Sequence, residues 1–136
     1  AMANLPQGWQ SIIGLQFENL VINNRKKLLE LLAIPLHEVI ISNPYLQTAT
    51  TRQKKCQIDY LIQTQFNTLY VCEIKFHRNE VGLSIIQEMQ QKISALNIPT
   101  GFSVRPVLIH VNGVAESVIA KHYFAHIINF SNFLSN

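Results

Sequence analysis

The segment CQIDYLIQTQFNTLYVCEIKF, residues 56–76, restricts the fold of this chain more than any other part of it. Apolar and polar residues alternate on both sides of a polar turn, which is the pattern of two antiparallel β-strands in a hairpin. We predict that Gln65-Phe66-Asn67 forms the loop, because a loop of this length pairs Thr64 with Thr68. A loop of two or four residues would reverse the relative faces of the strands unless a β-bulge restored them.

This register gathers the polar side chains of the hairpin into one patch. Asp59 then lies opposite Glu73, and Gln57 lies opposite Lys75. The even-numbered residues from Cys56 to Ile62 are predicted to form one continuous core face, with the polar patch on the other face.

Two opposed carboxylates repel each other and need a positive charge beside them. Lys75 can supply part of that charge, and a divalent cation bound by Asp59 and Glu73 would supply it better, because hard cations such as Mg²⁺ prefer oxygen ligands. In phosphodiester hydrolysis a metal polarises the phosphate and activates water, while a lysine orients that water or neutralises developing charge. The alternative is a simple ion pair between Lys75 and either carboxylate.

The remaining sequence predicts a layered α/β domain. The expected elements are an amphipathic helix over 9–32, a strand over 37–42, a polar connection with a turn at Asn43-Pro44, the hairpin, a helix over 81–96, a strand over 102–111, a helix over 114–123 and a short strand from 125. The helix over 81–96 is a crossover, so the following strand is expected to run parallel to the second hairpin strand. The order α-β-β-β-α-β-α-β predicts a central mixed sheet flanked by helices.

Composition narrows the class further. With 136 residues the chain is expected to form a single domain over 1–136, with a tag remnant or disordered start at 1–8, excised from a larger protein. Hydrophobic residues make up 48% and charged residues 14%, which excludes a disordered chain and is consistent with a surface that faces a partner. Cys56 and Cys72 are too few for a disulfide framework and are predicted to be core residues. No apolar run approaches the roughly 20 residues of a membrane-spanning helix, so we expect a cytoplasmic protein with no membrane partner.

The hairpin motif and the element order carry a resemblance to a known family. Asp59 in one strand and Glu73-Ile74-Lys75 in the next, within an αβββαβ core, resemble the restriction-endonuclease-like nuclease superfamily, written PD-(D/E)XK. Ile58 stands where a proline often precedes the aspartate. Within the superfamily, the chain is most similar to the nuclease-like domain at the C-terminal end of certain prokaryotic P-loop ATPases. The resemblance implies that Asp59, Glu73 and Lys75 are catalytic and that Mg²⁺ or Mn²⁺ is the cofactor.

The resemblance also implies a metal-binding glutamate on the first helix. Glu18 fits this role, because residues three and four positions away from it are mostly apolar and place it on or beside the buried face. Carried over by position, Glu18, Asp59, Glu73 and the carbonyl of Ile74 would bind the metal. An ordinary surface glutamate is the alternative for Glu18.

Several polar residues beside the motif are candidates for contacts with nucleic acid. They are Lys54 and Lys55 before the first hairpin strand, and His77 and Arg78 after the second. All four could reach a phosphate backbone, although ordinary loop charges are equally consistent with the pattern. Some superfamily members use a glutamine of the crossover helix, and Gln87, Gln90 and Gln91 all remain open for that role.

The histidines offer a weaker signal. His110 has apolar neighbours and is predicted to be a hydrogen-bonded core residue. His122 and His126 are four residues apart, but no third ligand accompanies them, so we do not predict a zinc site.

Two functions therefore compete. The first is a metal-dependent DNA endonuclease domain that hydrolyses phosphodiester bonds. The second is a non-catalytic module of the same fold that binds nucleic acid or a protein partner beside an ATPase domain. DNA is the expected partner, with a homodimer and a covalently linked P-loop ATPase domain as further candidates. Nucleotide hydrolysis by this chain itself is disfavoured, because it has no G-x-x-x-x-G-K-[ST] segment.

Overall fold

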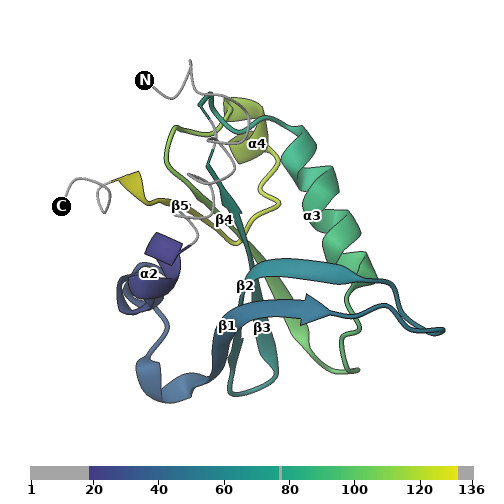
Figure 1. Ribbon diagram of the computed structural model, residues 1–136. Helices are drawn as coiled ribbons and strands as arrows, with labels where there is room; N and C mark the ends of the chain where they lie inside the picture. The colour runs from purple at the N-terminus through teal and green to yellow at the C-terminus, as the bar shows by residue number, and fades with distance from the viewer. Residues whose placement is uncertain (1–18, 77, 132–136) are drawn as a thin grey trace.

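A five-stranded mixed sheet forms the centre of the molecule in the computed structural model, which describes residues 19–76 and 78–131 (Figure 1). The elements are α2 Arg25–Leu31, the 3-10 turn η2 Leu36–Glu38, β1 Val39–Gln47, β2 Cys56–Thr64, β3 Thr68–Lys75, α3 Ser84–Ala95, β4 Ser103–His110, α4 Glu116–Ala120 and β5 His126–Asn129. The strands lie in the order β1-β2-β3-β4-β5; β1, β2 and β3 pair antiparallel, and β3, β4 and β5 pair parallel. The αβββαβ core with a mixed sheet is confirmed, including the parallel strand after the crossover helix.

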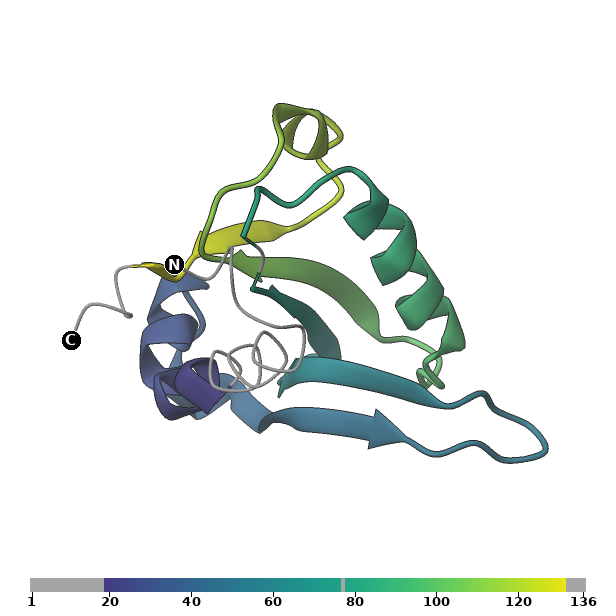
Figure 2. The same cartoon turned by 45° about the horizontal axis from the view of Figure 1, so that its top comes forward.

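Helices cover the two faces of this sheet, so the protein has three layers (Figure 2). On one face Leu28 and Leu29 of α2 pack against Tyr60 and Ile62 of β2 and the facing residues of β3 and β4. On the other face α3 and α4 pack through apolar side chains spaced at helical intervals, namely Ile85, Met89 and Val118. Within the described ranges, no helix is both long and apolar enough to cross a membrane.

The hairpin between β2 and β3 has the predicted register near its loop, but the predicted pairs Asp59–Glu73 and Gln57–Lys75 lie beyond the end of the ladder. Thr64 pairs with Thr68, and the ladder runs without interruption to Tyr60 and Cys72. Phe66 and Asn67 in this three-residue loop both have positive φ, 68° and 58°. The predicted loop is therefore confirmed.

Strand β1 extends further than the sequence suggested. We predicted a turn at Asn43-Pro44, and this is wrong, because β1 continues through both residues to Gln47. A proline is tolerated here because β1 is the edge strand of the sheet and Pro44 sits at an irregularity in its pairing with β2.

That irregularity is a β-bulge in β2. Asn43 pairs with Leu61 and Tyr45 pairs with Ile58, so the single residue Pro44 faces two residues, Asp59 and Tyr60. The extra residue reverses the faces of the strand on either side of it.

Because of the bulge, the prediction that the even-numbered residues of β2 form one continuous core face is wrong. Tyr60 and Ile62 pack on the α2 side of the sheet, whereas Cys56 and Ile58 pack on the α3 side together with Leu61. The alternation of a strand holds only while each residue opposes one partner, and at Asp59 it does not. Asp59 therefore lies at the point where β2 changes face.

The first predicted helix is interrupted in its described part. Residues 19–23 are helical, the chain turns at Asn24, and α2 begins at Arg25. The side-chain amide of Asn24 donates a hydrogen bond to the carbonyl oxygen of Leu20 at 2.8 Å. Asparagine side chains compete in this way with the backbone hydrogen bonds of a helix. The earlier part of this helix lies outside the described residues.

Candidate functional site

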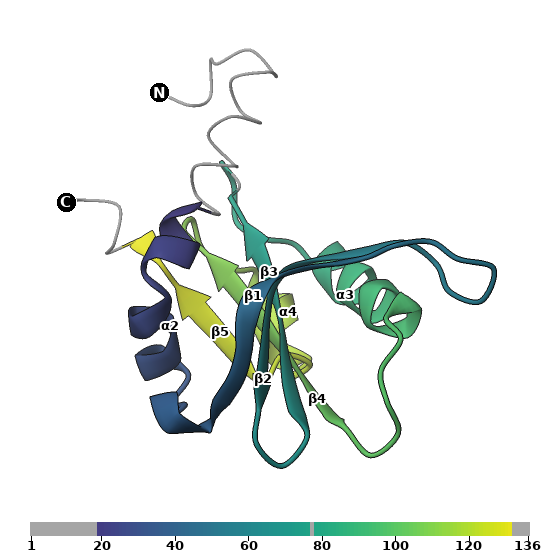
Figure 3. The same ribbon diagram turned by 60° about the horizontal axis from the view of Figure 1, so that its bottom comes forward.

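The site forms where β2 and β3 part. The pairing between these strands ends at Tyr60 and Cys72, and the next residues are Asp59 on one strand and Glu73 on the other. Beyond this point β1 and β2 curve away from β3 toward α3 (Figure 3). The Oδ2 atom of Asp59 accepts a hydrogen bond from the backbone nitrogen of Ile74 at 2.8 Å, so a carboxylate bridges the strands where the backbone ladder stops. This bond fixes the position of Asp59.

Glu73 extends from β3 toward α3 and is almost completely buried, with 2% of its surface exposed. Its Oε1 atom accepts a hydrogen bond from the Nζ of Lys92 on α3 at 2.8 Å. Its Oε2 atom is buried and finds no hydrogen-bond partner among the described residues. A buried carboxylate oxygen without a donor is costly, so this atom marks the place where a ligand would be stabilising.

The electrostatics of Glu73 follow from this environment. Burial raises its pKa from 4.5 to about 7, and the adjacent Asp59 carboxylate acts in the same direction, against Lys92. A proton on Glu73 would be shared with the Asp59 carboxylate. Burial lowers the pKa of Lys92, but the hydrogen bond to Glu73 and the nearby carboxylate charges outweigh it, so the net change is upward. Lys92 therefore remains a cation beside the two acids.

The expected role of Lys75 as the counter-charge of the carboxylates is corrected by the structure. The Nζ of Lys75 lies 3.4 Å from Oε1 of Glu88 on α3, and the cation that contacts Glu73 is Lys92. Sequence reasoning missed Lys92 because Glu88 and Lys92 are four residues apart on one helix, which is typical of an exposed helical ion pair. In the fold each of them instead reaches across to a different residue of β3.

Two hollows open on either side of Asp59. The first has a volume of about 550 Å³ between β2 and α3 and is lined by Lys55, Cys56, Gln57, Asp59, Glu88, Gln91, Lys92 and Ala95. The second, of about 290 Å³, lies on the β1 side and is lined by Asn19, Ile22, Pro44, Tyr45, Leu46, Gln57, Ile58 and Asp59. Asp59 is therefore accessible to a ligand from both sides of the strand.

The structure brings some of the predicted site residues together and leaves others apart. Asp59 and Glu73 lie next to each other where β2 and β3 part, and Lys55 lines the hollow between β2 and α3. Of the three glutamines of the crossover helix, Gln91 lines that hollow as well. All three glutamines and Lys54 line an adjacent hollow, while Arg78 is exposed after β3. Glu18 and His77 lie outside the described residues, so their predicted roles remain predictions.

Within residues 19–76 and 78–131, no three histidine, cysteine, aspartate or glutamate side chains form a metal-binding group. The described part of the site therefore offers two carboxylates, Asp59 and Glu73.

The predictions for the thiols and for His110 are confirmed. Cys56 and Cys72 are free and buried, and burial raises the pKa of both thiols. His110 is buried, and its Nδ1 accepts a hydrogen bond from the backbone nitrogen of Gly113 at 3.1 Å.

Comparison with solved structures supports the fold. The chain is similar to a repair endonuclease from Pyrococcus abyssi, with a TM-score of 0.50 and 15% sequence identity over 82% of this chain. It spans 44% of the length of that protein. No family model and no curated protein sequence matches the chain.

These observations define the fold of the protein. It is a mixed-sheet α/β fold, consistent with a restriction-endonuclease-like core. The paired acids Asp59 and Glu73 lie where its central strands part.

Proposed function

We propose that this chain is a metal-dependent DNA endonuclease domain that hydrolyses phosphodiester bonds. The observation that carries the proposal is the Oε2 atom of Glu73, which is buried without a donor next to the Asp59 carboxylate. Natural cores avoid such an arrangement unless it serves a ligand or a reaction.

The donor set fits a hard divalent cation. Carboxylate oxygens are the ligands that Mg²⁺ and Mn²⁺ prefer, and the Oε2 of Glu73 needs a positive partner. Asp59 and Glu73 would hold the metal, with the carbonyl of Ile74 and Glu18 as the further ligands that the family resemblance implies. When bound, such a metal polarises the phosphate and lowers the pKa of a coordinated water.

The other groups around Asp59 and Glu73 orient the two acids or supply positive charge. The backbone nitrogen of Ile74 orients Asp59, and Lys92 holds one oxygen of Glu73 so that the other faces Asp59. Lys75 is held by Glu88 at the end of β3, with about a fifth of its side chain exposed. From there it is proposed to orient the attacking water or to neutralise charge that develops on the phosphate.

A cleavage assay tests this proposal. Supercoiled, linear and single-stranded DNA would be incubated with the wild-type chain in Mg²⁺ or Mn²⁺, beside Asp59→Asn and the control Glu116→Gln on α4. We expect cleavage by the wild type and by the control, and a loss of roughly 100-fold or more in Asp59→Asn, the size of effect seen when a group that stabilises the transition state is removed. If the wild type cuts no DNA form with either metal, the proposal is wrong.

One observation favours a second candidate, a non-catalytic module that binds nucleic acid or a protein partner, for example beside a linked P-loop ATPase domain. Lys92 already neutralises part of the charge at Glu73, which is the work that a metal would otherwise do. Under this candidate, DNA binding would be the same in the presence of Mn²⁺ and of EDTA, and Asp59→Asn would bind as the wild type does.

A further inference from the structure

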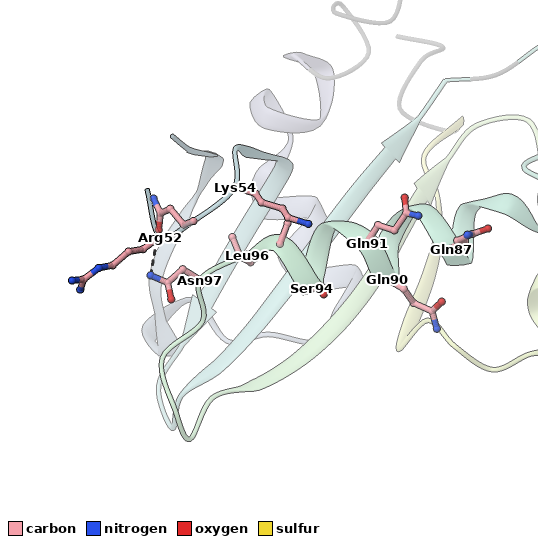
Figure 4. Close-up of a pocket in the computed structure, with 10 residues that line it drawn as sticks. Arg52, Lys54, Gln87, Gln90, Gln91, Ser94, Leu96 and Asn97 are labelled. Atoms are coloured by element: carbon pink, nitrogen blue, oxygen red, sulfur yellow. Dashed lines mark hydrogen bonds between the residues drawn. The ribbon is translucent and has the colours of Figure 1, made fainter. Parts of the chain in front are cut away.

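A third, larger hollow adjoins the site. It has a volume of about 1050 Å³ and lies between the loop over 48–55, which joins β1 to β2, and α3 (Figure 4). Its lining residues are Arg52, Gln53, Lys54, Gln87, Gln90, Gln91, Ser94, Ala95, Leu96 and Asn97. No element of the proposed chemistry uses this hollow.

A buried glutamine fixes its walls. Gln47, at the end of β1, is 3% exposed and donates hydrogen bonds to the carbonyl oxygens of Lys54 at 2.8 Å and Ala95 at 2.7 Å. Its Oε1 accepts a hydrogen bond from the backbone nitrogen of Asn97 at 2.7 Å. These three bonds tie both ends of the loop and the end of α3 to one side chain, so the hollow is a built feature of the fold.

The lining holds two cations, several side-chain amides and no acid, beside the apolar residues Ala95 and Leu96. Lys54 extends over α3 toward Gln91, whereas Arg52 extends outward, away from the helix (Figure 4). The amides of Gln87, Gln90 and Gln91 are exposed, and none of them makes a hydrogen bond within the described part of the chain. An amide offers both donors and acceptors, and a lining with a cation and no carboxylate suits an anionic ligand that also bears polar groups.

The hollow is continuous with the site. Gln91 and Ala95 line both this hollow and the one that contains Asp59 and Lys92. A chain-like ligand with one phosphate at Asp59 would therefore pass over Gln91 into the hollow between the 48–55 loop and α3.

We propose that the hollow between the 48–55 loop and α3 binds the stretch of DNA strand next to the scissile phosphate. Lys54 contacts a phosphate, and the amides of α3 contact the backbone and base edges. This inference rests on the proposed function.

Site-directed photocrosslinking tests the path of the strand. The photoreactive residue p-benzoylphenylalanine would be placed at Ser94 in the hollow, at Gln57 beside Asp59, or at Lys27 on α2, which covers the opposite face of the sheet. Each full-length variant would be irradiated with fluorescent DNA, single-stranded and duplex, in Ca²⁺. We expect crosslinks at Ser94 and Gln57 and none at Lys27.

Other outcomes separate this inference from the proposed function. Crosslinking at Gln57 without Ser94 would overturn the hollow between the 48–55 loop and α3 as a DNA site and leave the nuclease proposal standing. Crosslinking at neither position would overturn both.

A binding measurement adds a quantitative test. We expect Lys54→Ala to weaken DNA binding for all sequences alike and to reduce the slope of log affinity against log salt by about 1, as the loss of one phosphate contact predicts. Lys27→Ala, which removes an equal charge elsewhere, should leave the slope unchanged. Equal slopes for Lys54→Ala and the wild type would contradict the proposed phosphate contact.

Discussion

Replacing Glu73 with glutamine should stabilise the protein above pH 7 and change little near pH 4. The folded state raises the pKa of Glu73 from 4.5 to about 7, mainly through burial. A raised acid pKa means that the folded state binds a proton which the unfolded chain releases, so the wild type loses stability as the pH rises from about 4.5 through about 7. Glutamine resembles the neutral acid and avoids this loss.

The magnitude follows from the shift. Each pKa unit corresponds to about 1.4 kcal/mol, so the wild type is expected to lose about 3 kcal/mol across this range because of Glu73. Glu73→Gln should therefore gain up to about 3 kcal/mol over the wild type at pH 8, and near zero at pH 4. Lys92, the partner of Glu73, remains about one third exposed and keeps contact with water in the variant.

Urea unfolding followed by circular dichroism would measure this difference at both pH values. With a slope of about 1–3 kcal/mol per molar urea, a gain of this size moves the midpoint by about 1–3 M. Glu88→Gln is the matched control, since that side chain is half exposed and its ion pair with Lys75 is worth under about 1 kcal/mol. If Glu73→Gln and the wild type differ equally at pH 4 and pH 8, the environment assigned to Glu73 is wrong.

Three further variants test separate parts of the structure. Lys92→Met should destabilise the protein by about 1–3 kcal/mol above pH 7, because Glu73 loses its only described donor. The loss of stability with rising pH should then continue to a higher pH than in the wild type. An unchanged pH profile in urea unfolding would argue against the ion pair. Asp59→Ala should cost about 1–3 kcal/mol more than Asp59→Asn, which keeps an acceptor for the Ile74 nitrogen; equal unfolding midpoints for the two would contradict that bond. Phe66→Gly should raise stability by about 1 kcal/mol, because Phe66 is 86% exposed and has a φ of 68° that glycine adopts without strain; a lower melting temperature would show that the ring makes a contact that the fold depends on.

The hairpin and the order of the elements could be predicted because they depend on local rules. The loop at Gln65-Phe66-Asn67 fixes the register of β2 and β3, and the spacing of apolar residues over 81–96 identifies the crossover helix. Both signals lie within a few residues of the feature that they determine.

The length of β1 and the bulge in β2 could not be predicted in the same way. Asn43-Pro44 is a turn signal in most contexts, and it is tolerated in β1 only because this strand is the edge of the sheet. The bulge at Asp59 and Tyr60 arises from pairing with a residue fifteen positions earlier, Pro44, whose register the sequence does not show.

The proximity of the two acids could be predicted, whereas the cation beside them could not. Asp59 and Glu73 belong to one hairpin and directly follow its last paired residues, Tyr60 and Cys72, so the hairpin brings them near each other. Lys92 approaches from α3 across the layer, and its contact with Glu73 depends on how the helix packs on the sheet. Contacts between layers require the tertiary structure.

Calorimetric titration of Mn²⁺ into the folded wild-type chain and into Asp59→Asn tests whether Asp59 and Glu73 form a metal site. We expect binding to the wild type and loss of that binding in Asp59→Asn, with both proteins showing the same circular dichroism. No binding to the wild type, or equal binding to both proteins, would contradict the assignment of Asp59 and Glu73 as a metal site.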